Sequence, residues 1–223
     1  MQECMEILRL RNPHILRLSS NRRNIFYSVR RKNGTSLSNL AGLIHQKFLG
    51  KCGLIYLRTT EECNAVAGKL QQLLLSSTTI SPYHAKLKSN KRAAVEREWQ
   101  RGSINVLCAT KAFGMGIDKS DVRFVIHYDM PDCIESYVQE SGRAGRDGKP
   151  AYSVIYFCLS DKHKWESMFR GSSPHQLLSS KMLKLNEVTK MCLDEISCRR
   201  ASILGQLGDS VDSIECDKMC DNW

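Results

Sequence analysis

The run YVQESGRAGRDGK at residues 137–149 decides how the fold of this chain is interpreted. It places Gln139, Arg143 and Arg146 on one short element, with small residues around the arginines, so another molecule can approach them closely. A guanidinium is always charged and presents a planar fork of donors that suits phosphate oxygens. An isolated RxxR pair is usually only a solvated basic turn, so its meaning depends on the neighbouring sequence.

A second distinctive run, ATKAFGMGIDKSDVRFVIH, occupies residues 109–127, immediately upstream. Within it, Gly114 and Gly116 permit tight backbone turns of the kind found next to phosphate groups. The carboxylate of Asp118 can accept hydrogen bonds at the same place.

Short apolar runs rich in branched residues alternate with helical patterns over the first 160 residues. Strands are predicted at Ile25–Val29, Leu54–Leu57, Ile80–Tyr83, Val106–Ala109, Phe124–His127 and Val154–Phe157. Helices are predicted at Leu37–Leu49, Glu61–Leu75, Asn90–Gln100 and Ile134–Ser141, and after Asp161 at Gln176–Leu193 and Cys198–Leu207. This alternation predicts an α/β fold with a mostly parallel sheet flanked by helices. Both runs follow predicted strands, so we expect both at the carboxyl edge of the sheet.

Composition and charge narrow the classes of function. Hydrophobic content of 42% and charged content of 25% are typical of a folded domain, and no apolar run approaches the roughly 20 residues of a membrane span. The ten cysteines are scattered, which favours a reducing compartment and free thiols. Residues 1–100 hold 17 Lys or Arg against six Asp or Glu, whereas residues 101–223 nearly balance. This asymmetry predicts a positive face that binds a polyanion.

Together the two runs resemble two motifs of the RecQ-type DNA helicases, members of the superfamily-two motor ATPases. Residues 13–27, 53–63 and 83–87 (PHILRLSSNRRNIFY, GLIYLRTTEEC, YHAKL) resemble further landmarks of the second motor lobe. The 223 residues contain no GxxxxGK[ST] phosphate loop and no DExH-type box, which the family carries in a first motor lobe. The resemblance implies a RecA-like C-terminal helicase lobe at 1–160, followed by a truncated helical zinc-binding subdomain at 161–223.

The resemblance also implies roles for the residues of both runs. Arg143 and Arg146 match positions that reach across the lobe interface to ATP bound with Mg²⁺, and we expect Arg146 to be the arginine finger. Gln139 would couple the nucleotide state to DNA. Asp118 and the two glycines before it would lie near the nucleotide. The alternative is that the arginines only brace their own lobe.

Contacts with DNA are implied at three loops of the lobe. The candidates are Arg58, Thr59, His84, Lys86, Thr110 and Lys111. Two alternatives stay open, because His84 follows a predicted strand and could be a buried histidine, and Lys111 could simply be solvated. Arg22 and Arg23 stand where the family more often has Arg-Pro, which adds charge and removes a rigid proline.

The terminal cysteines resemble the zinc ligands of the family. Cys198, Cys216 and Cys220 match three ligands, and the fourth is expected where Trp223 stands. A structural zinc site needs four ligands and tryptophan cannot ligate, so we expect Zn²⁺ binding to be possible but impaired. Cys192 is predicted to belong to the core.

The function expected from the resemblance is that of the C-terminal motor half of an ATP-dependent 3′–5′ DNA helicase of repair and recombination. Its partners would be single-stranded or fork-like DNA and the first motor lobe, without a membrane, and in the nucleus if the source is eukaryotic. A truncated, non-catalytic nucleic-acid-binding or regulatory product is the alternative. An RNA helicase is disfavoured, because ESGRAGR replaces the HRxGRxGR form of those enzymes.

Overall fold

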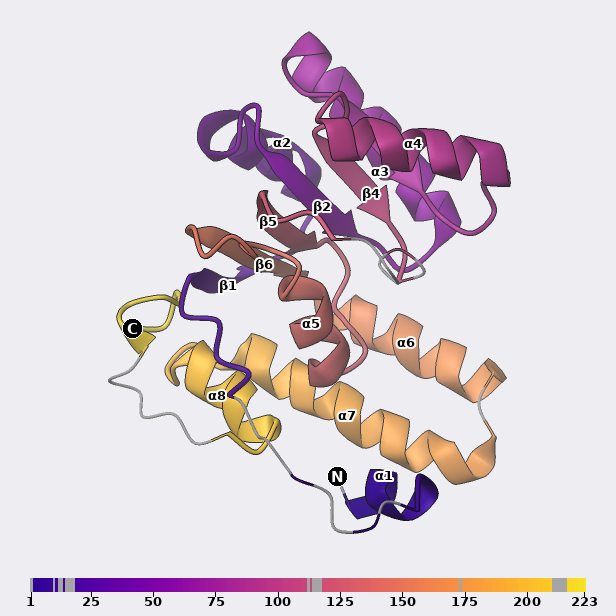
Figure 1. Cartoon of the computed structure of the whole chain (residues 1–223), viewed down its shortest axis with the longest axis vertical. Coiled ribbons are helices and arrows are strands. Elements are labelled where there is room, and N and C mark those ends of the chain that lie inside the picture. The colour runs from indigo at the N-terminus through magenta and orange to yellow at the C-terminus, as the bar shows by residue number, and fades with distance from the viewer. Residues whose placement is uncertain are drawn as a thin grey trace.

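Six parallel strands and the helices on both of their faces form the body of the protein (Figure 1). The computed structural model describes residues 2–9, 11, 14, 19–111, 113, 118–172, 174–209 and 216–223. The strands are β1 (Ile25–Arg31), β2 (Cys52–Tyr56), β3 (Ile80–Tyr83), β4 (Val106–Ala109), β5 (Val122–His127) and β6 (Ala151–Phe157). The helices are α1 (Gln2–Ile7), α2 (Ser36–Lys47), α3 (Thr60–Leu74), α4 (Ser89–Arg101), α5 (Ile134–Ser141), α6 (Leu159–Ser172), α7 (His175–Leu193) and α8 (Arg199–Gln206), with a 3₁₀ turn at Leu75–Ser77.

The strand order in the sheet is β1-β6-β5-β2-β4-β3, and each neighbouring pair is parallel. The predicted parallel α/β sheet is therefore confirmed, and every predicted strand overlaps an observed one. Helix α6 begins at Leu159, two residues before the point at which the sequence pattern turns helical. None of the helices in the described ranges is long and apolar enough to cross a bilayer.

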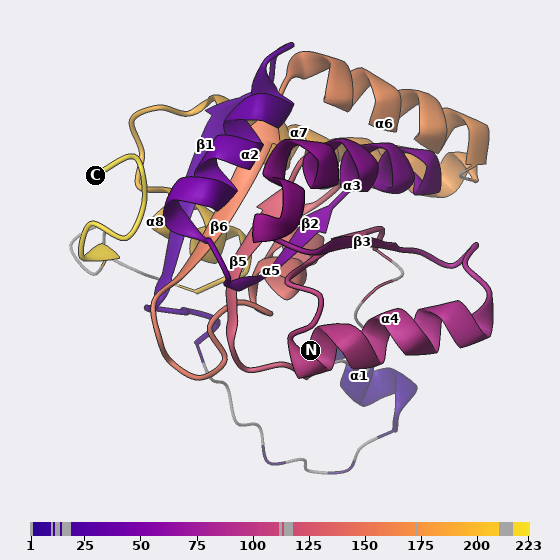
Figure 2. The same ribbon diagram turned by 90° about the horizontal axis from the view of Figure 1, so that it is seen from above.

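Side chains alternate between the two faces of the strands, as a period of two requires. In β2, Leu54 and Tyr56 belong to one hydrophobic core, whereas Ile55 between them belongs to the other. Helices α2 and α3 cover the second core, and Figure 2 shows both lying over the strands in the view from above. Helices α5 to α8 lie on the opposite face (Figure 1).

The C-terminal helices share their core with the sheet. Leu185 and Val188 of α7 and Ile203 of α8 are at most 2% exposed and belong to the same cluster as Tyr27 of β1 and Tyr137 of α5. The aromatic rings of Tyr27 and Tyr137 meet edge to face at 6.1 Å. The division at residues 160 and 161 stays a prediction, and the parts on either side of it pack on one continuous apolar interior.

Replacing Gly53 by alanine is expected to destabilise the protein by about 1–3 kcal/mol, because a Cβ there would lie 2.1 Å from the Phe124 ring across the sheet. Urea denaturation measures the free energy of unfolding. Gly42→Ala is the matched control, since a Cβ at Gly42 meets nothing within 4 Å and alanine favours the helix by up to about 1 kcal/mol. Equal stability of the two variants would contradict the packing argument.

Candidate functional site

The arginine-bearing turn lies at the amino edge of the sheet, opposite to the edge predicted. Arg143 and Arg146 follow α5 and precede β6. The amide of Gly145, between them, donates to the carbonyl of Val122, the first residue of β5, at 2.8 Å. The chain reaches this edge only after α5, because Glu140 in the last turn of α5 still lies 2.7 Å from His127, the last residue of β5. The carboxyl-edge prediction was therefore wrong for the backbone of the turn, whereas the end of α5 lies at the predicted edge.

Two side chains from the segment before β1 brace this turn. Arg22 donates to the carbonyls of Gly142, Ala144 and Gly145 at 2.8, 2.9 and 2.8 Å. Asn24 donates to the carbonyl of Gly145 at 2.8 Å. These bonds satisfy backbone carbonyls of the turn that follows α5. Sequence reasoning missed this role, because Arg22 was noted only as the arginine of a segment that resembles the family's Arg-Pro.

The basic side chains of the turn gather with a third cation that sequence reasoning also missed. Arg146 pairs with Asp118 at 2.5 Å, and these side chains are 35% and 80% exposed. Arg143 is half-buried and lines one small hollow together with Arg146 and Lys119. Burial raises the pKa of Tyr56 strongly, although Arg143 hydrogen-bonds its hydroxyl and acts to lower that pKa. The structure therefore brings Arg143, Arg146 and Asp118 together.

The structure says less about the roles of the other residues of the two runs. Gln139 is exposed on α5. Gly114 and Gly116 lie outside the described residues. Phe113 is 1% exposed and packs edge to face on Trp99 at 5.6 Å, so it belongs to the core.

The six candidate DNA contacts lie together at the carboxyl edge. They follow three neighbouring strands of the sheet, in the order β2, β4 and β3. The pairs are Arg58 and Thr59 after β2, Thr110 and Lys111 after β4, and His84 and Lys86 after β3. The carboxyl ends of neighbouring parallel strands meet at one edge, and for Thr110 and Lys111 this is the edge that the sequence predicted.

The loop after β2 is held by local hydrogen bonds. Thr59 caps α3 by accepting from the Glu62 amide at 3.2 Å, and Glu62 also accepts from the Arg58 guanidinium at 2.8 Å. His84 is 3% exposed and its Nε2 lies 3.2 Å from the Asn64 side-chain oxygen. Burial lowers the pKa of His84. This burial favours the alternative reading of His84, and its DNA contact stays a prediction.

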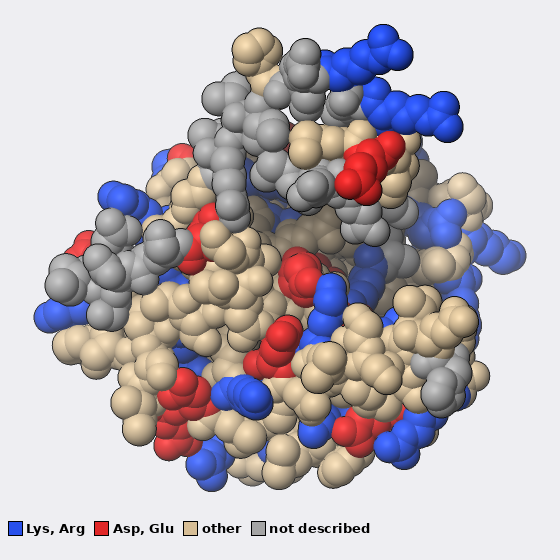
Figure 3. Space-filling view, turned by 90° about the horizontal axis from the view of Figure 1, so that it is seen from below, with Lys and Arg blue, Asp and Glu red and all other residues tan. Residues whose placement is uncertain are grey.

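Each candidate lysine at this edge already has a carboxylate partner. Lys86 pairs with Glu61 at 2.6 Å, and both side chains are exposed. Hydrogen bonding from Lys86 lowers the pKa of Glu61 to about 2. Lys111 pairs with Asp132 and also donates to Ser136 at 3.2 Å. On the face drawn in Figure 3, basic and acidic side chains are likewise interspersed around a hollow and form no continuous basic patch.

A cleft of about 450 Å³ opens at the carboxyl edge, between the strand ends and α6. Thr110 and Lys111 line it, as do the aromatic side chains of Trp165 and Phe169. The indole of Trp165 donates to the Met130 carbonyl at 2.7 Å, and the Lys111 ammonium lies 5.5 Å from the centre of the Trp165 ring system. The cleft is therefore apolar on its helical side and polar on its strand side.

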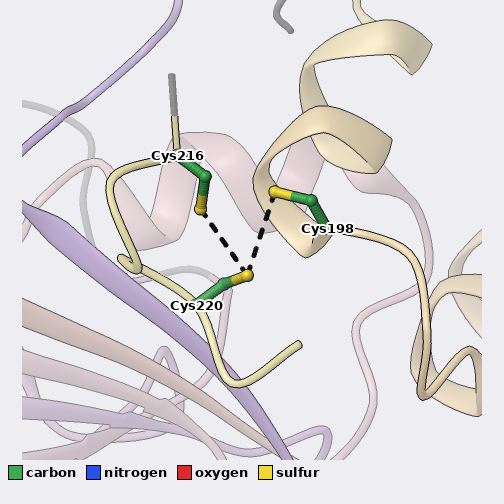
Figure 4. Close-up of side chains that lie close together, drawn as sticks. All are labelled: Cys198, Cys216 and Cys220. Atoms are coloured by element: carbon green, nitrogen blue, oxygen red, sulfur yellow. Dashed lines mark hydrogen bonds between the residues drawn. The ribbon is translucent and has the colours of Figure 1, made fainter. Parts of the chain in front are cut away.

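The predicted zinc ligands converge beside β1 (Figure 4). The sulfur of Cys220 lies 3.6 Å from that of Cys216 and 3.9 Å from that of Cys198. Zinc–sulfur bonds of about 2.3 Å in a tetrahedron separate two sulfurs by about 3.8 Å, so these distances fit three of the four positions. Trp223 is 74% exposed and carries no ligating atom. The three thiols fit zinc, and the fourth ligand has to come from elsewhere.

The thiols differ in how readily they ionise. Burial acts to raise the pKa of Cys198, but hydrogen bonds from the amides of Ala201 and Arg200 and from the other two thiols outweigh it, so the net shift is downward. Burial, reinforced by the neighbouring thiols, raises the pKa of Cys216 to about 12. Metal ligation requires thiolates, so Cys198 is more prepared to bind than Cys216.

The cysteine segment is fixed to the free edge of β1. The amide of Tyr27 donates to the carbonyl of Met219, and the amide of Asp221 donates to that of Tyr27, both at 3.1 Å. The Asp221 carboxylate accepts from the amide of Val29 at 2.8 Å. Cys192 is 6% exposed within the core, as predicted. The nine described cysteines are all free thiols.

Fold and site together define the class of a motor-type α/β lobe with an arginine turn, followed by a helical cysteine subdomain. The family description "Helicase conserved C-terminal domain" matches residues 35–148, and "RecQ zinc-binding" matches residues 159–222. The chain belongs to the RecQ-type helicases, of which it carries the C-terminal helicase domain and the zinc-binding domain.

Individual relatives agree with this assignment. The chain is 35% identical to the ATP-dependent helicase SGS1 of Saccharomyces cerevisiae, over 96% of this chain and 15% of the relative. It is 36% identical to ATP-dependent DNA helicase Q1 of Rattus norvegicus, over 100% of this chain and 35% of the relative. The chain thus spans about a third or less of these relatives. The structure of S. cerevisiae Dbp5 bound to RNA and ADP BeF3 superposes with a TM-score of 0.61 at 19% identity, covering 84% of this chain and 51% of Dbp5, which shows the fold.

Trp223→Cys is expected to tighten zinc binding at least roughly 100-fold, because it supplies the fourth thiolate of a closed tetrahedral site. Competition with a chromophoric chelator under reducing conditions measures the affinity. Trp223→Ala removes the same ring without adding a thiol and should bind zinc as the parent chain does. Stoichiometric, tightly held zinc on the parent chain would overturn the prediction that Trp223 impairs the site.

Proposed function

We propose that this chain is the second motor half of an ATP-dependent RecQ-type DNA helicase. It would supply arginines to a nucleotide bound with the first lobe and would contact DNA at the carboxyl edge of its sheet. The observation that carries the proposal is the gathering of Asp118 and Lys119 beside the braced turn that bears Arg143 and Arg146. Family membership supports the choice of ATP and DNA as ligands.

The ion pair with Asp118 would neutralise Arg146 until a nucleotide binds. Asp118 is 80% exposed, so its carboxylate can be displaced by a phosphate group that carries more charge. Arg146 would then exchange one anionic partner for another without being left unpaired. The triphosphate with Mg²⁺ supplies the transferred phosphoryl group, and cationic side chains lower the barrier by neutralising its charge. Arg143, half-buried beside Tyr56, would hold the second contact.

The carboxyl edge would bind the DNA backbone. Its lysines are paired with Glu61 and Asp132, and phosphates would replace these carboxylates one for one. The Lys86–Glu61 pair is exposed, and exposed ion pairs contribute little stability, so exchange at Lys86 costs little. The cleft beside Trp165 offers apolar and polar walls to an unpaired nucleotide.

Substituting Arg146 by alanine is expected to reduce DNA-stimulated ATP turnover by about 10³-fold or more in a polypeptide that joins the first motor lobe of the rat relative to this chain. The 223-residue chain alone should show no turnover above that of its own Arg146→Ala variant. Arg97→Ala, an exposed arginine on α4, is the control and should leave turnover unchanged. Turnover by the chain alone, or equal rates for the Arg146 and Arg97 variants, would refute the proposal.

Glu61→Gln is expected to tighten binding of single-stranded DNA a few-fold at low salt, because it frees Lys86 from its carboxylate partner. Lys86→Ala should weaken binding and reduce the slope of log K against log salt by about one. Fluorescence anisotropy across a salt series measures both effects. Lys69→Ala removes an exposed charge ten residues into α3 and should change neither quantity. An unaltered slope for Lys86→Ala would show that the β3 end does not touch DNA.

A further inference from the structure

We propose that Arg22 is a positioning residue that sets the geometry of the arginine-bearing turn at residues 142–149, and that Arg200 of the C-terminal subdomain holds Arg22 in place. The inference rests on the proposed function, since the turn is the part of the lobe that would meet the nucleotide. It adds a route by which the helical subdomain controls the motor arginines.

The route begins at α8. Arg200 is 1% exposed, and its guanidinium donates to the carbonyls of Arg22 and Ile25 at 2.8 and 2.6 Å and to the Asn21 side chain at 2.6 Å. Its charge also lies 5.2 Å from the centre of the Tyr27 ring. A buried charge is costly unless it is hydrogen-bonded, and the Arg200 Nε has no partner among the described residues, so the acceptors that segment 21–25 presents to the two NH2 groups are the ones that compensate its burial. Arg200 therefore determines the path of the chain into β1.

Side chains of the same segment hold the turn by hydrogen bonds. The side chain of Arg22 spans three carbonyls, those of Gly142, Ala144 and Gly145. Asn24 adds two bonds, to the carbonyls of Gly145 and Lys149, both at 2.8 Å.

The backbone of the turn depends on this support. Gly145 has a φ of +61°, and a Cβ there would lie 2.4 Å from the Asn24 amide nitrogen. The turn therefore has the positive φ and the close approach that only glycine accommodates at no cost. Five donated bonds from Arg22 and Asn24 hold it, and the arginines at 143 and 146 flank the braced carbonyls.

Arg23 makes it possible to separate the positioning role of Arg22 from an effect of positive charge alone. Arg23 is exposed, whereas its neighbour Arg22 is half-buried against the turn. The two residues are adjacent and identical, so Arg23→Ala removes the same charge without removing the hydrogen bonds to the turn. The pair therefore provides a matched control within the chain.

Amide hydrogen exchange of the 223-residue chain tests the route. Arg22→Ala and Arg200→Ala are each expected to quicken exchange of the amides at 142–148 about tenfold or more, while the amides of α2 and α3 keep their rates. The double variant should exceed the larger single effect only slightly, because both residues act on one route. Arg23→Ala should match the parent chain.

Two further variants separate positioning from general loss of stability. Ile44→Val weakens the opposite core and should leave the relative protection of the turn unchanged. If Arg200→Ala does not fold, Asn21→Ala removes a single acceptor of Arg200 and should quicken exchange of the turn by two- to threefold. Turn exchange like that of the parent chain in folded Arg200→Ala, or in Asn21→Ala where Arg200→Ala does not fold, overturns the inference.

A functional comparison completes the test. In the two-lobe polypeptide, Arg22→Ala should lower kcat for ATP about tenfold and leave DNA affinity unchanged, because the candidate DNA contacts lie in other loops, after β2, β3 and β4. A parallel loss of both would indicate a merely structural role. If Arg146→Ala keeps full turnover while turn exchange responds as expected, the proposed function fails and the positioning route stands. If instead Arg146→Ala loses turnover while exchange of the turn does not respond, the positioning route fails and the proposed function stands.

Discussion

The buried guanidinium of Arg200 is the interaction on which the rest of the structure depends. It lies where α8, the segment before β1 and the Tyr27 ring meet, and it donates to atoms 175 to 179 residues away in the chain. Its burial is tolerated only because those acceptors are in place. A local error in either segment would leave a charge unpaired in the interior, so the two ends of the chain constrain each other.

The same constraint makes the cysteine subdomain an integral part of the lobe's structure. Arg199 donates to the Met191 carbonyl and pairs with Asp221, which in turn accepts from the amide of Val29. The cysteine segment thereby covers the exposed edge of β1, a position that parallel sheets rarely leave open. Even with Trp223 in place of a fourth ligand, hydrogen bonds of its own hold this segment to the lobe.

The separation of the two candidate sites follows from the topology. In a parallel sheet a strand carries the chain to the carboxyl edge and its helix carries it back, so a motif's edge depends on where its helix ends. Thr110 and Lys111 follow β4 directly and stay at the carboxyl edge. Arg143 and Arg146 follow all of α5, and the backbone between them reaches the amino end of β5, while the Arg143 side chain hydrogen-bonds Tyr56, the last residue of β2.

Prediction from the sequence succeeded where the signal was local. The span of α5 and the residues of β3 and β4 match the pattern of apolar positions, and Thr59 with Glu62 carries a capping signature. It failed for Arg22 and Lys119, which look like any exposed base in the sequence and acquire their roles only from distant partners.

The sequence by itself determined the order of the elements, the parallel sheet, the family and the identity of the arginines and cysteines. These depend on periodicity and spacing within short windows, which any reader of the chain can inspect. Only the tertiary structure decided which edge holds each motif, which carboxylate each lysine meets, and that one core joins lobe and subdomain. The physical reason is that these outcomes rest on contacts such as Arg200 with Arg22, which lie 178 residues apart and leave no local pattern.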